Sequence, residues 1–420
     1  MIQTLAFRFK HFLKERHQLS RSGSEELLSV SEYYGVAPRS AVFSKERQES
    51  RAESLEGYRI VKKGDLVMNY MLAWKGAYGI SSYDGIVSPA YSVFEVDQSI
   101  VDLRFLHHRT RSRDMQGTFK SASKGIMESR LRLYPETLLS LPVELPSLGY
   151  QRQVSEYLDE KTARIDTLVA KKTRFIELLK EKRQAVITKA VTKGLDDSVE
   201  MKDSGVDSIG FFPIHWQLKR LKYIAKVQTG IAKGKDHAGK KTISVPYLRV
   251  ANVQDGHLLL EDVATMEIPQ EDLARYSLKC GDVLMNEGGD FDKLGRGHVW
   301  NDEITPCVHQ NHVFAVRPYA VSSEWLNAFT SSRVAQFYFM GRSKQSTNLA
   351  SISSTNLMEL PVPVPPHREQ VLIIESLQRS TDKLTALTAR TERSIEFLKE
   401  HRAALITAAV TGKIDVREAA

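Results

Sequence analysis

One run of residues has the composition of a phosphate-binding loop. Gly234–Lys241 contains the spaced glycines and the lysine of a P-loop, in which backbone amides and the lysine hold the phosphates of a nucleotide. Lys241 stands where that motif needs a serine or threonine to bind magnesium, and no clear apolar strand precedes Gly234. The run therefore favours a flexible basic loop able to touch a phosphate backbone over a site that hydrolyses nucleotides.

The other residues that could do chemistry form no complete site. Cys307, His309 and His312 could bind zinc, but no second cluster completes a set of four ligands, which favours core or surface histidines. The glycines at 288–289 and 295–297 lack the strand and the downstream acid of a dinucleotide site. We find no convincing pair of nucleophile and base and no nuclease-like cluster of acids and lysine. We therefore expect a recognition role, with no catalytic residue, metal or cofactor in this chain.

The bulk composition favours an anionic partner. The 420 residues carry a net charge of +8, and the pI is about 9.2, which points to nucleic acid ahead of a membrane surface. The two cysteines, Cys280 and Cys307, exclude a disulfide scaffold and fit a reducing compartment. Basic residues interrupt Met1–Arg16, so it is no signal peptide, and no apolar run is long enough to cross a bilayer. We expect a soluble, cytoplasmic protein without a membrane partner.

The sequence contains an internal repeat. A single shift of 219 positions carries residues 141–143 onto 360–362 and residues 187–188 onto 406–407, without a gap. This period is far longer than that of a stacked solenoid, so it indicates a duplicated module. Two copies of one module on one chain imply approximate two-fold symmetry, and hence two equivalent places on whatever the protein binds.

Each repeat ends in a predicted long helix. Neither proline nor glycine occurs between about Gln151 and Lys193, and the second helix is predicted from about Glu369 to Val410. Gly194 and Gly412 are the expected C-terminal stops. Each helix of about 40 residues would span about 60 Å.

Both helices carry an apolar stripe on one side, which needs a partner. We expect the two helices to pair as an antiparallel coiled coil, and the alternative is that each packs on its own globular module. The predicted seam residues are Ile165, Leu168, Phe175, Leu179 and Val186 in the first helix, and Leu384, Leu387, Ile395, Leu398 and Leu405 in the second.

The segments that precede the helices are also related, though more weakly. Gly64–Asn69 corresponds to Gly281–Asn286, and residues 8–11 loosely match residues 220–223. The offsets drift from 212 to 220, so the loops have changed length. A shared scaffold with altered loops is typical of two sites that read different targets.

The assembled motifs resemble those of the DNA-specificity subunits of type I restriction–modification systems, over essentially the whole chain. The most specific motifs are residues 187–196, 201–205, 209–210, Pro213-Ile214-His215-Trp216, 220–222 and 409–417. The first module departs from the pattern, because it lacks the Pro-x-His-Trp start and begins almost directly at Arg8.

The resemblance implies a non-catalytic reader with an α+β fold. Two α/β target-recognition domains would each contact one half of a bipartite, asymmetric double-stranded DNA target. The paired helices would set their spacing, and each half of the pseudo-two-fold scaffold would dock one of two modification subunits. The domains implied are 1–147, the first target-recognition domain; 148–195, the central spacer helix; 196–362, the second target-recognition domain; and 363–420, the C-terminal spacer helix and tail.

The cofactors of such a complex would belong to partner subunits. The modification subunits methylate adenine with S-adenosylmethionine, and the restriction subunits translocate and cut DNA with ATP and magnesium. Two other functions stay open. One is a restriction enzyme with built-in catalytic activity, and the other is a coiled-coil scaffold that binds only protein.

Basic, aromatic and amide residues in predicted loops are the candidates for DNA contact, because cations bind phosphates and amides read base edges. In the first module they are Tyr33, Tyr34, Arg39, Lys45, Trp74, Lys75, Lys124 and Arg130. In the second module they are Lys233, Lys235, Lys240, Arg249, Asn252, Lys293, Arg296, Arg342, Lys344, Gln345 and Asn348.

Overall fold

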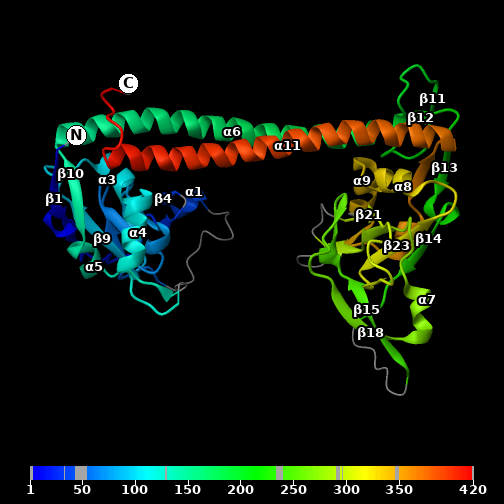
Figure 1. Cartoon of the computed structure of the whole chain (residues 1–420), viewed down its shortest axis with the longest axis horizontal. Coiled ribbons are helices and arrows are strands. Elements are labelled where there is room, and N and C mark those ends of the chain that lie inside the picture. Colours follow the sequence, from blue (N-terminus) through cyan, green and yellow to red (C-terminus); the bar gives the residue numbers. More distant parts are fainter. Residues whose placement is uncertain are drawn as a thin grey trace. The chain divides into compact units, whose positions relative to one another are not determined.

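The chain forms two compact units, each built from one globular module and parts of both long helices. The first unit contains Met1–Thr173 and Glu392–Ala420, and the second contains Arg174–Thr391 (Figure 1). The computed structural model describes residues 3–32, 34–42, 54–127, 130–232, 240–289, 294–295, 297–345 and 350–418, and the backbone alone of Gln345.

The two long helices are α6, Leu148–Lys193, and α11, His367–Val410. The prolines before each helix lie in strands: β10, Pro142–Pro146, pairs with β1, Thr4–Arg8, and β26, Pro361–Val364, pairs with β13, Gln217–Arg220. Prolines are tolerated at the edges and ends of such short strand pairs, so these residues can belong to strands and still precede the helices.

Both helices end near a glycine with a positive φ angle. Gly194 has φ 76° and Gly412 has φ 70°, a left-handed conformation that L-residues with a side chain rarely adopt. The predicted stops are confirmed at both positions.

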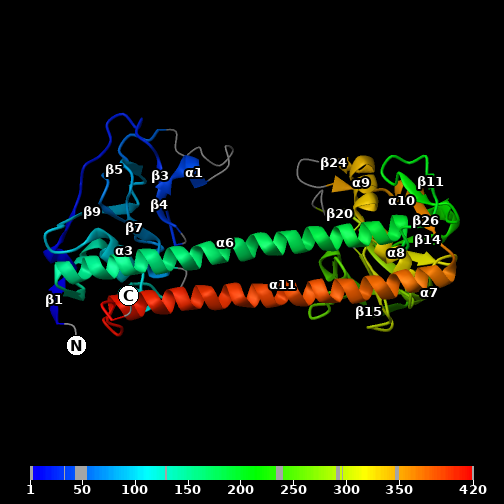
Figure 2. The same ribbon diagram turned by 90° about the horizontal axis from the view of Figure 1, so that it is seen from above.

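The helices pack against each other in opposite directions. In the first unit, Leu158 near the start of α6 shares a core with Ile406 near the end of α11, and Arg402 binds Asp166 with Nε 2.9 Å from Oδ1. In the second unit, Ile187 near the end of α6 shares a core with Ile373 near the start of α11. Figures 1 and 2 show the two helices side by side. The predicted α+β fold with a pair of long helices is confirmed.

The alternative of packing on a neighbouring module also holds in part. The buried residues Tyr150 and Val154 of α6 belong to the same core as the first globular module. Each helix therefore contacts the module that precedes it as well as the other helix.

Burial along the helices corrects the predicted seam. Ile165, Leu179 and Ile395 are buried, and Val186, Leu384, Leu398 and Leu405 are partly buried. Leu168, Phe175 and Leu387 are exposed, at 46%, 41% and 40%, and are not buried seam residues. Ile176 is buried in place of Phe175. A helix with 3.6 residues per turn drifts away from a strict three-and-four spacing, which turns these predicted positions toward solvent.

The first globular module is built on an antiparallel four-stranded sheet. Its order is β2-β9-β6-β7, with bounds Leu13–Glu15, Tyr91–Val96, Leu66–Asn69 and Tyr78–Ile80. Two strand pairs flank it, β3–β4 (Leu28–Ser31 and Gly35–Pro38) and β5–β8 (Arg59–Val61 and Gly85–Val87). The helical elements are η1 (Phe9–His11), α1 (Arg39–Val42), η2 (Ala73–Lys75), α3 (Leu103–Thr110), α4 (Arg113–Ala122) and α5 (Pro135–Ser140).

The second module contains a matching sheet of order β14-β23-β19-β21, with bounds Ala225–Thr229, Val313–Pro318, Val283–Asn286 and Gly297–Val299. A second sheet of order β18-β15-β22 has bounds Ala264–Pro269, Thr242–Leu248 and Val308–His309. The short strands are β11 (Met201–Asp203), β12 (Phe211–Pro213), β16 (Val253–Gln254), β17 (His257–Leu258), β20 (Gly288–Gly289), β24 (Lys344–Gln345) and β25 (Ala350–Ser351). The helical elements are η4 (Leu221–Tyr223), η5 (Val250–Asn252), η6 (Gln270–Asp272), α7 (Leu273–Tyr276), α8 (Ser323–Thr330), α9 (Arg333–Arg342) and α10 (Ser354–Met358).

The weak sequence repeat between the modules corresponds to equivalent elements. The motifs ending at Asn69 and Asn286 form strands β6 and β19, which are paired on both sides in their sheets. Residues 8–11 and 220–223 contain the single turns η1 and η4, each of which follows a strand paired with the end of its own module. No helix among the described residues is both long and apolar enough to cross a membrane.

Candidate nucleic-acid interface

Lys124 and Lys344 occupy equivalent places in the two modules. Lys124 follows α4 and forms an isolated antiparallel bridge with Arg132, and its amide lies 2.9 Å from the Arg132 carbonyl oxygen. Lys344 follows α9 and pairs with Ser351 in the β24–β25 ladder. The same antiparallel backbone pairing thus places a lysine shortly after α4 in the first module and shortly after α9 in the second.

A second backbone contact lies beside this pairing in each module. The amide of Leu133 donates to the Tyr70 carbonyl oxygen, and the amide of Ile352 donates to the Glu287 carbonyl oxygen, both at 2.9 Å. Tyr70 and Glu287 directly follow the matched strands β6 and β19. The scaffold is therefore the same, while the side chains at the equivalent positions differ.

Ion pairs between a buried aspartate and a partly exposed arginine fix the opposite ends of these two strands. Asp65 precedes β6 and is 3% exposed, with Oδ2 2.9 Å from Arg16 Nε, and Asp282 precedes β19 and is fully buried, with Oδ2 2.6 Å from Arg317 Nη2. The Asp65 carboxylate also raises the pKa of Arg16 by its hydrogen bond. Such charge-assisted pairs hold each strand in one register.

In the first module, cations and aromatic rings gather near Lys124. The ammonium groups of Lys75 and Lys120 lie 5.0 and 5.5 Å from the Trp74 ring centroid, and the Arg132 guanidinium lies 5.9 Å from that of Tyr70. These are cation–π distances. We call Tyr70, Trp74, Lys75, Lys120, Lys124 and Arg132 the basic cluster of the first module. Its cations can bind phosphates and its rings can stack on bases or sugars.

The sequence predicted part of this cluster. Trp74, Lys75 and Lys124 belong to it, and Arg130 is exposed close by in the sequence. Tyr70, Lys120 and Arg132 were missed, although the density of basic residues between 120 and 132 was a usable signal.

Two other candidates of the first module lie elsewhere. The Tyr34 hydroxyl is 3.0 Å from Ser29 Oγ at the turn between β3 and β4, and Arg39 begins α1. Tyr33 and Lys45 lie outside the described residues.

In the second module, Arg342 and Lys344 lie at the end of α9 and the start of β24. The Arg342 guanidinium is 5.3 Å from the Tyr338 ring centroid, and Lys344 is exposed. Nearby in this scaffold, His312 Nδ1 lies 2.8 Å from Glu287 Oε2.

Six candidates of the second module have no described side chain. The side chain of Gln345 is not described, and the candidates outside the described residues are Lys233, Lys235, Lys293, Arg296 and Asn348.

Three candidates of the second module are engaged within the protein. Asn252 is 3% exposed, donates from Nδ2 to the carbonyl oxygens of Leu259 and Asp262, and accepts from the Arg249 amide, so its role is structural and its prediction as a DNA contact was wrong. The Arg249 guanidinium lies 2.9 Å from Asp262 Oδ2. Of the P-loop-like run, the structure describes only Lys240 and Lys241. Lys240 Nζ lies 2.7 Å from Glu271 Oε1.

The cysteine and histidines considered for zinc are not gathered into a metal site. His309 is buried, its Nδ1 lies 2.7 Å from the Val313 carbonyl oxygen, and burial lowers its pKa. Burial also raises the pKa of Cys307 to about 12. His312 is at the surface with Glu287. Within the part of the chain that the structure describes, no three metal-ligating side chains come together.

Comparison with known proteins agrees with this layout. Residues 213–396 match the family described as the type I restriction modification DNA specificity domain. The specificity subunit of the type I restriction enzyme EcoKI from Escherichia coli (strain K12) is 24% identical over 285 residues, which cover 66% of this chain and 58% of that protein. The chain spans about three-fifths of the length of the curated relatives it matches.

Two solved structures share the fold. One, described as "Structural basis underlying complex assembly and conformational transition of the type I R-M system", has a TM-score of 0.71 and 16% identity, with 98% of both chains covered. The crystal structure of the HsdS subunit from Thermoanaerobacter tengcongensis has a TM-score of 0.52 and 16% identity, with 98% of this chain and 97% of that one covered.

The fold is that of a specificity subunit, with two β-rich modules and two long helices that pack together. Residues 213–396 match the DNA specificity domain of type I restriction–modification systems, and the chain is similar to the specificity subunits of these systems over a longer stretch.

Proposed function

We propose that this chain reads a bipartite, asymmetric double-stranded DNA target, with one half-site contacted by each module. The observation that carries the proposal is the equivalence of Lys124 and Lys344 on one scaffold with different surroundings. Lysine in both places supplies phosphate affinity whatever the sequence. The residues around it differ, with Tyr70 in the first module where the second has Glu287, so the two modules would prefer different bases.

The long helices would set the spacing of the two half-sites. Each runs without interruption through residues of both compact units, and α6 is 46 residues long. A continuous helix is stiff compared with a loop, so it suits a spacer.

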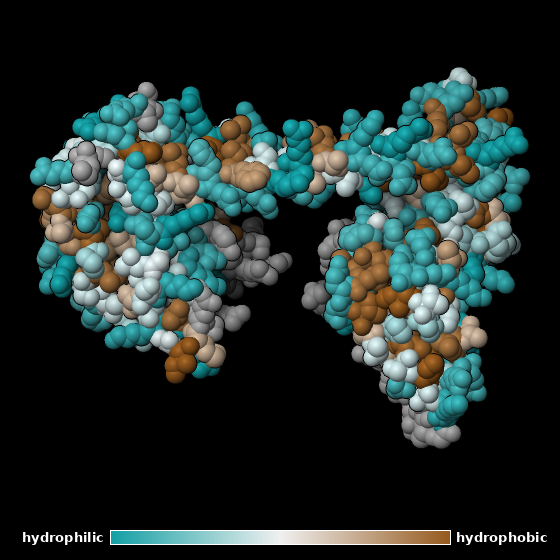
Figure 3. Space-filling view, in the orientation of Figure 1, coloured by the Kyte–Doolittle hydropathy of each residue, from teal (hydrophilic) through white to brown (hydrophobic). Residues whose placement is uncertain are grey.

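The outer faces of the helices would dock the two modification subunits. Leu168, Phe175, Leu178 and Leu387 are at least 40% exposed, and hydrophobic atoms remain visible among the hydrophilic ones along the helices in Figure 3. Exposed apolar side chains on a helix mark a surface that a protein partner can cover. Restriction subunits would join through the complex.

In this proposal the chain itself is non-catalytic. Adenine methylation with S-adenosylmethionine, and DNA translocation and cleavage with ATP and magnesium, would be the work of the partner subunits. The chain would contribute the choice of sequence alone.

The test is to map methylated adenines across a genome that carries this chain together with its modification subunit. We expect one motif made of two unlike halves separated by a fixed gap. Cells with the modification subunit alone are the control and should show no such motif. Methylation without a shared bipartite motif, or methylation by the isolated chain, would overturn the proposal.

A further inference from the structure

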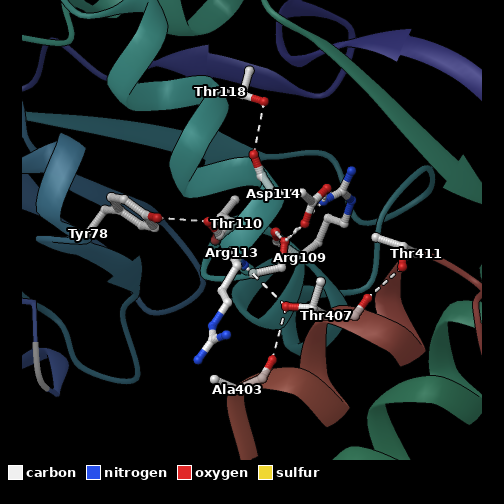
Figure 4. Close-up of polar contacts among 10 residues, drawn as sticks. Tyr78, Arg109, Thr110, Arg113, Asp114, Thr118, Ala403, Thr407 and Thr411 are labelled. Atoms are coloured by element: carbon white, nitrogen blue, oxygen red, sulfur yellow. Dashed lines mark hydrogen bonds and ion pairs between the residues drawn. The ribbon is translucent and has the colours of Figure 1, made fainter. Parts of the chain in front are cut away.

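The end of each long helix contacts the module of the other repeat. In the first unit, Thr407 of α11 accepts a hydrogen bond from the amide of Arg113, the first residue of α4, at 3.2 Å (Figure 4). In the second unit, Thr188 of α6 accepts one from the amide of Arg333, the first residue of α9, at 3.1 Å. The shift of 219 positions carries Thr188 onto Thr407. The same contact therefore occurs twice, each time between a helix of one repeat and a module of the other.

These threonines satisfy amides that a helix cannot satisfy by itself. The first four amides of a helix have no partner within it, and a side-chain oxygen usually caps them. In α4 the residue before the helix, Ser112, makes no such cap, and its single hydroxyl proton faces two acceptors, the Arg109 carbonyl oxygen at 2.7 Å and Asp114 Oδ1 at 2.6 Å. The hydroxyl proton of Thr407 is directed to the Ala403 carbonyl oxygen at 2.9 Å, which leaves its oxygen lone pairs to accept from Arg113 (Figure 4).

Apolar packing surrounds each contact. Ile406 and Val410, on either side of Thr407, are buried in the core of the first module. Their counterparts Ile187 and Val191 are buried in the core of the second module. Each hydrogen bond thus lies beside a packed apolar core, which holds the helix end in place against the module.

The capped helices connect these contacts to the candidate interface. α4 begins at the contact with Thr407 and is followed by Lys124, and its last turn contains Lys120 of the basic cluster. α9 begins at the contact with Thr188, ends at Arg342 and is followed by Lys344. A change in the direction of either helix would move the basic residues at its far end.

We propose that Thr407 and Thr188 are positioning residues for the opposite module, which rests on the proposed function of the two modules as DNA readers. Thr407, in the second repeat, orients α4 and thereby the half-site contacts of the first module. Thr188, in the first repeat, orients α9 and the half-site contacts of the second. Each half of the target is then read by residues of one repeat and tuned by a helix of the other.

The experiment compares affinities of the assembled complex for three duplexes: the full target, and targets with either half scrambled. The half read by the first module is assigned beforehand by replacing residues 1–147 with those of a relative of different specificity. For each chain, the dissociation constant for each scrambled duplex is divided by that for the full target. We expect Thr407→Val to lower this ratio about fivefold for the half read by the first module and to leave the other ratio unchanged, since one capping hydrogen bond is lost.

Matched variants separate positioning from general damage. Thr188→Val should lower the ratio for the other half only, and Thr407→Ser, which keeps the hydroxyl, should behave like the unchanged chain. Thr167→Val is the control, because that hydroxyl donates to the Ala163 carbonyl oxygen of its own helix. Faster hydrogen exchange at the Arg113 amide in Thr407→Val would show directly that the cap is lost.

The outcomes are distinguishable. Three results for Thr407→Val would overturn the inference and leave the reading function intact. They are a lower ratio only for the half read by the second module, an equal decrease of both ratios, and no change in either ratio. If scrambling either half leaves the affinity of the unchanged complex the same, the proposed function itself fails.

Discussion

Gln151 and Gln370 make the same hydrogen bonds in the two repeats. Gln151 accepts from the Asp102 amide at 2.9 Å and donates to the Pro146 carbonyl oxygen at 2.9 Å. Gln370 accepts from the Ser322 amide at 3.0 Å and donates to the Pro365 carbonyl oxygen at 2.9 Å. Each side chain is at most 2% exposed and joins the start of a long helix to the start of a module helix.

Removing one of these amides should therefore destabilise the junction. We expect Gln370→Ala to lower the free energy of unfolding by about 2–3 kcal/mol, because a buried amide and a buried carbonyl oxygen lose their partner. Urea unfolding measures this. Gln378→Ala, on an exposed position of the same helix, should change the value by no more than about 0.5 kcal/mol. Equal effects of the two variants would contradict the structural role of Gln370.

The long helices could be predicted from the sequence because their signals are local. The absence of proline and glycine over about 40 residues, and a glycine stop at Gly194, depend on nothing distant. The predicted start at about Gln151 lies close to the observed Leu148. The strand Pro142–Pro146 was missed because its partner is Thr4–Arg8, far away in the sequence.

The candidate site was predictable only in part, since it depends on contacts between distant segments. A basic residue in a loop can be found by eye, as Lys124 was, but the sequence does not show that Lys120 lies over Trp74. Nor does it show that Asn252 is buried with its amide fully used. Whether a polar side chain meets DNA or its own backbone is decided by tertiary packing.

The corrected seam gives a direct test of the helix pair. Ile165 is 7% exposed and Leu168, one turn later on α6, is 46% exposed. We expect Ile165→Asp to lower the free energy of unfolding by about 3 kcal/mol, because it buries an unpaired charge. Leu168→Asp is the matched control and should change it by less than about 0.5 kcal/mol. Unfolding midpoints in urea give both values, and a larger cost for Leu168→Asp would reverse the assignment of the seam.

His107 should make the first unit sensitive to acid. Burial, followed by the nearby charges of His108, Arg111 and Arg402, lowers its pKa to about 3. An unfolded histidine has a pKa of about 6.5, so the unfolded chain binds more protons between these values, and stability falls as the pH falls from about 6.5 toward 3. At pH 5 the loss from this residue is about 2 kcal/mol relative to pH 7.

The second module supplies a suitable replacement, because Asn327 holds the place of His107 at the same position of the equivalent helix α8. We expect His107→Asn to reduce the loss of stability between pH 7 and pH 5 by about 2 kcal/mol. The exposed His17→Asn is the control and should leave the pH dependence unchanged. An unchanged slope in His107→Asn would show that this histidine is not the acid-sensitive group.

The basic residues that end or follow α4 and α9 should each contribute to the salt dependence of DNA binding, in proportion to the charges removed. If each ammonium group neutralises one phosphate, Lys124→Ala should reduce the slope of log K against log salt by about 1, and the pair Arg342→Ala and Lys344→Ala should reduce it by about 2. Specific affinity should fall in both cases. Lys171→Ala, on an exposed position of α6, is the matched control for a lost positive charge and should leave the slope unchanged. Slopes of the assembled complex that fall equally in all three chains would show that net charge, and not these two places, governs the affinity.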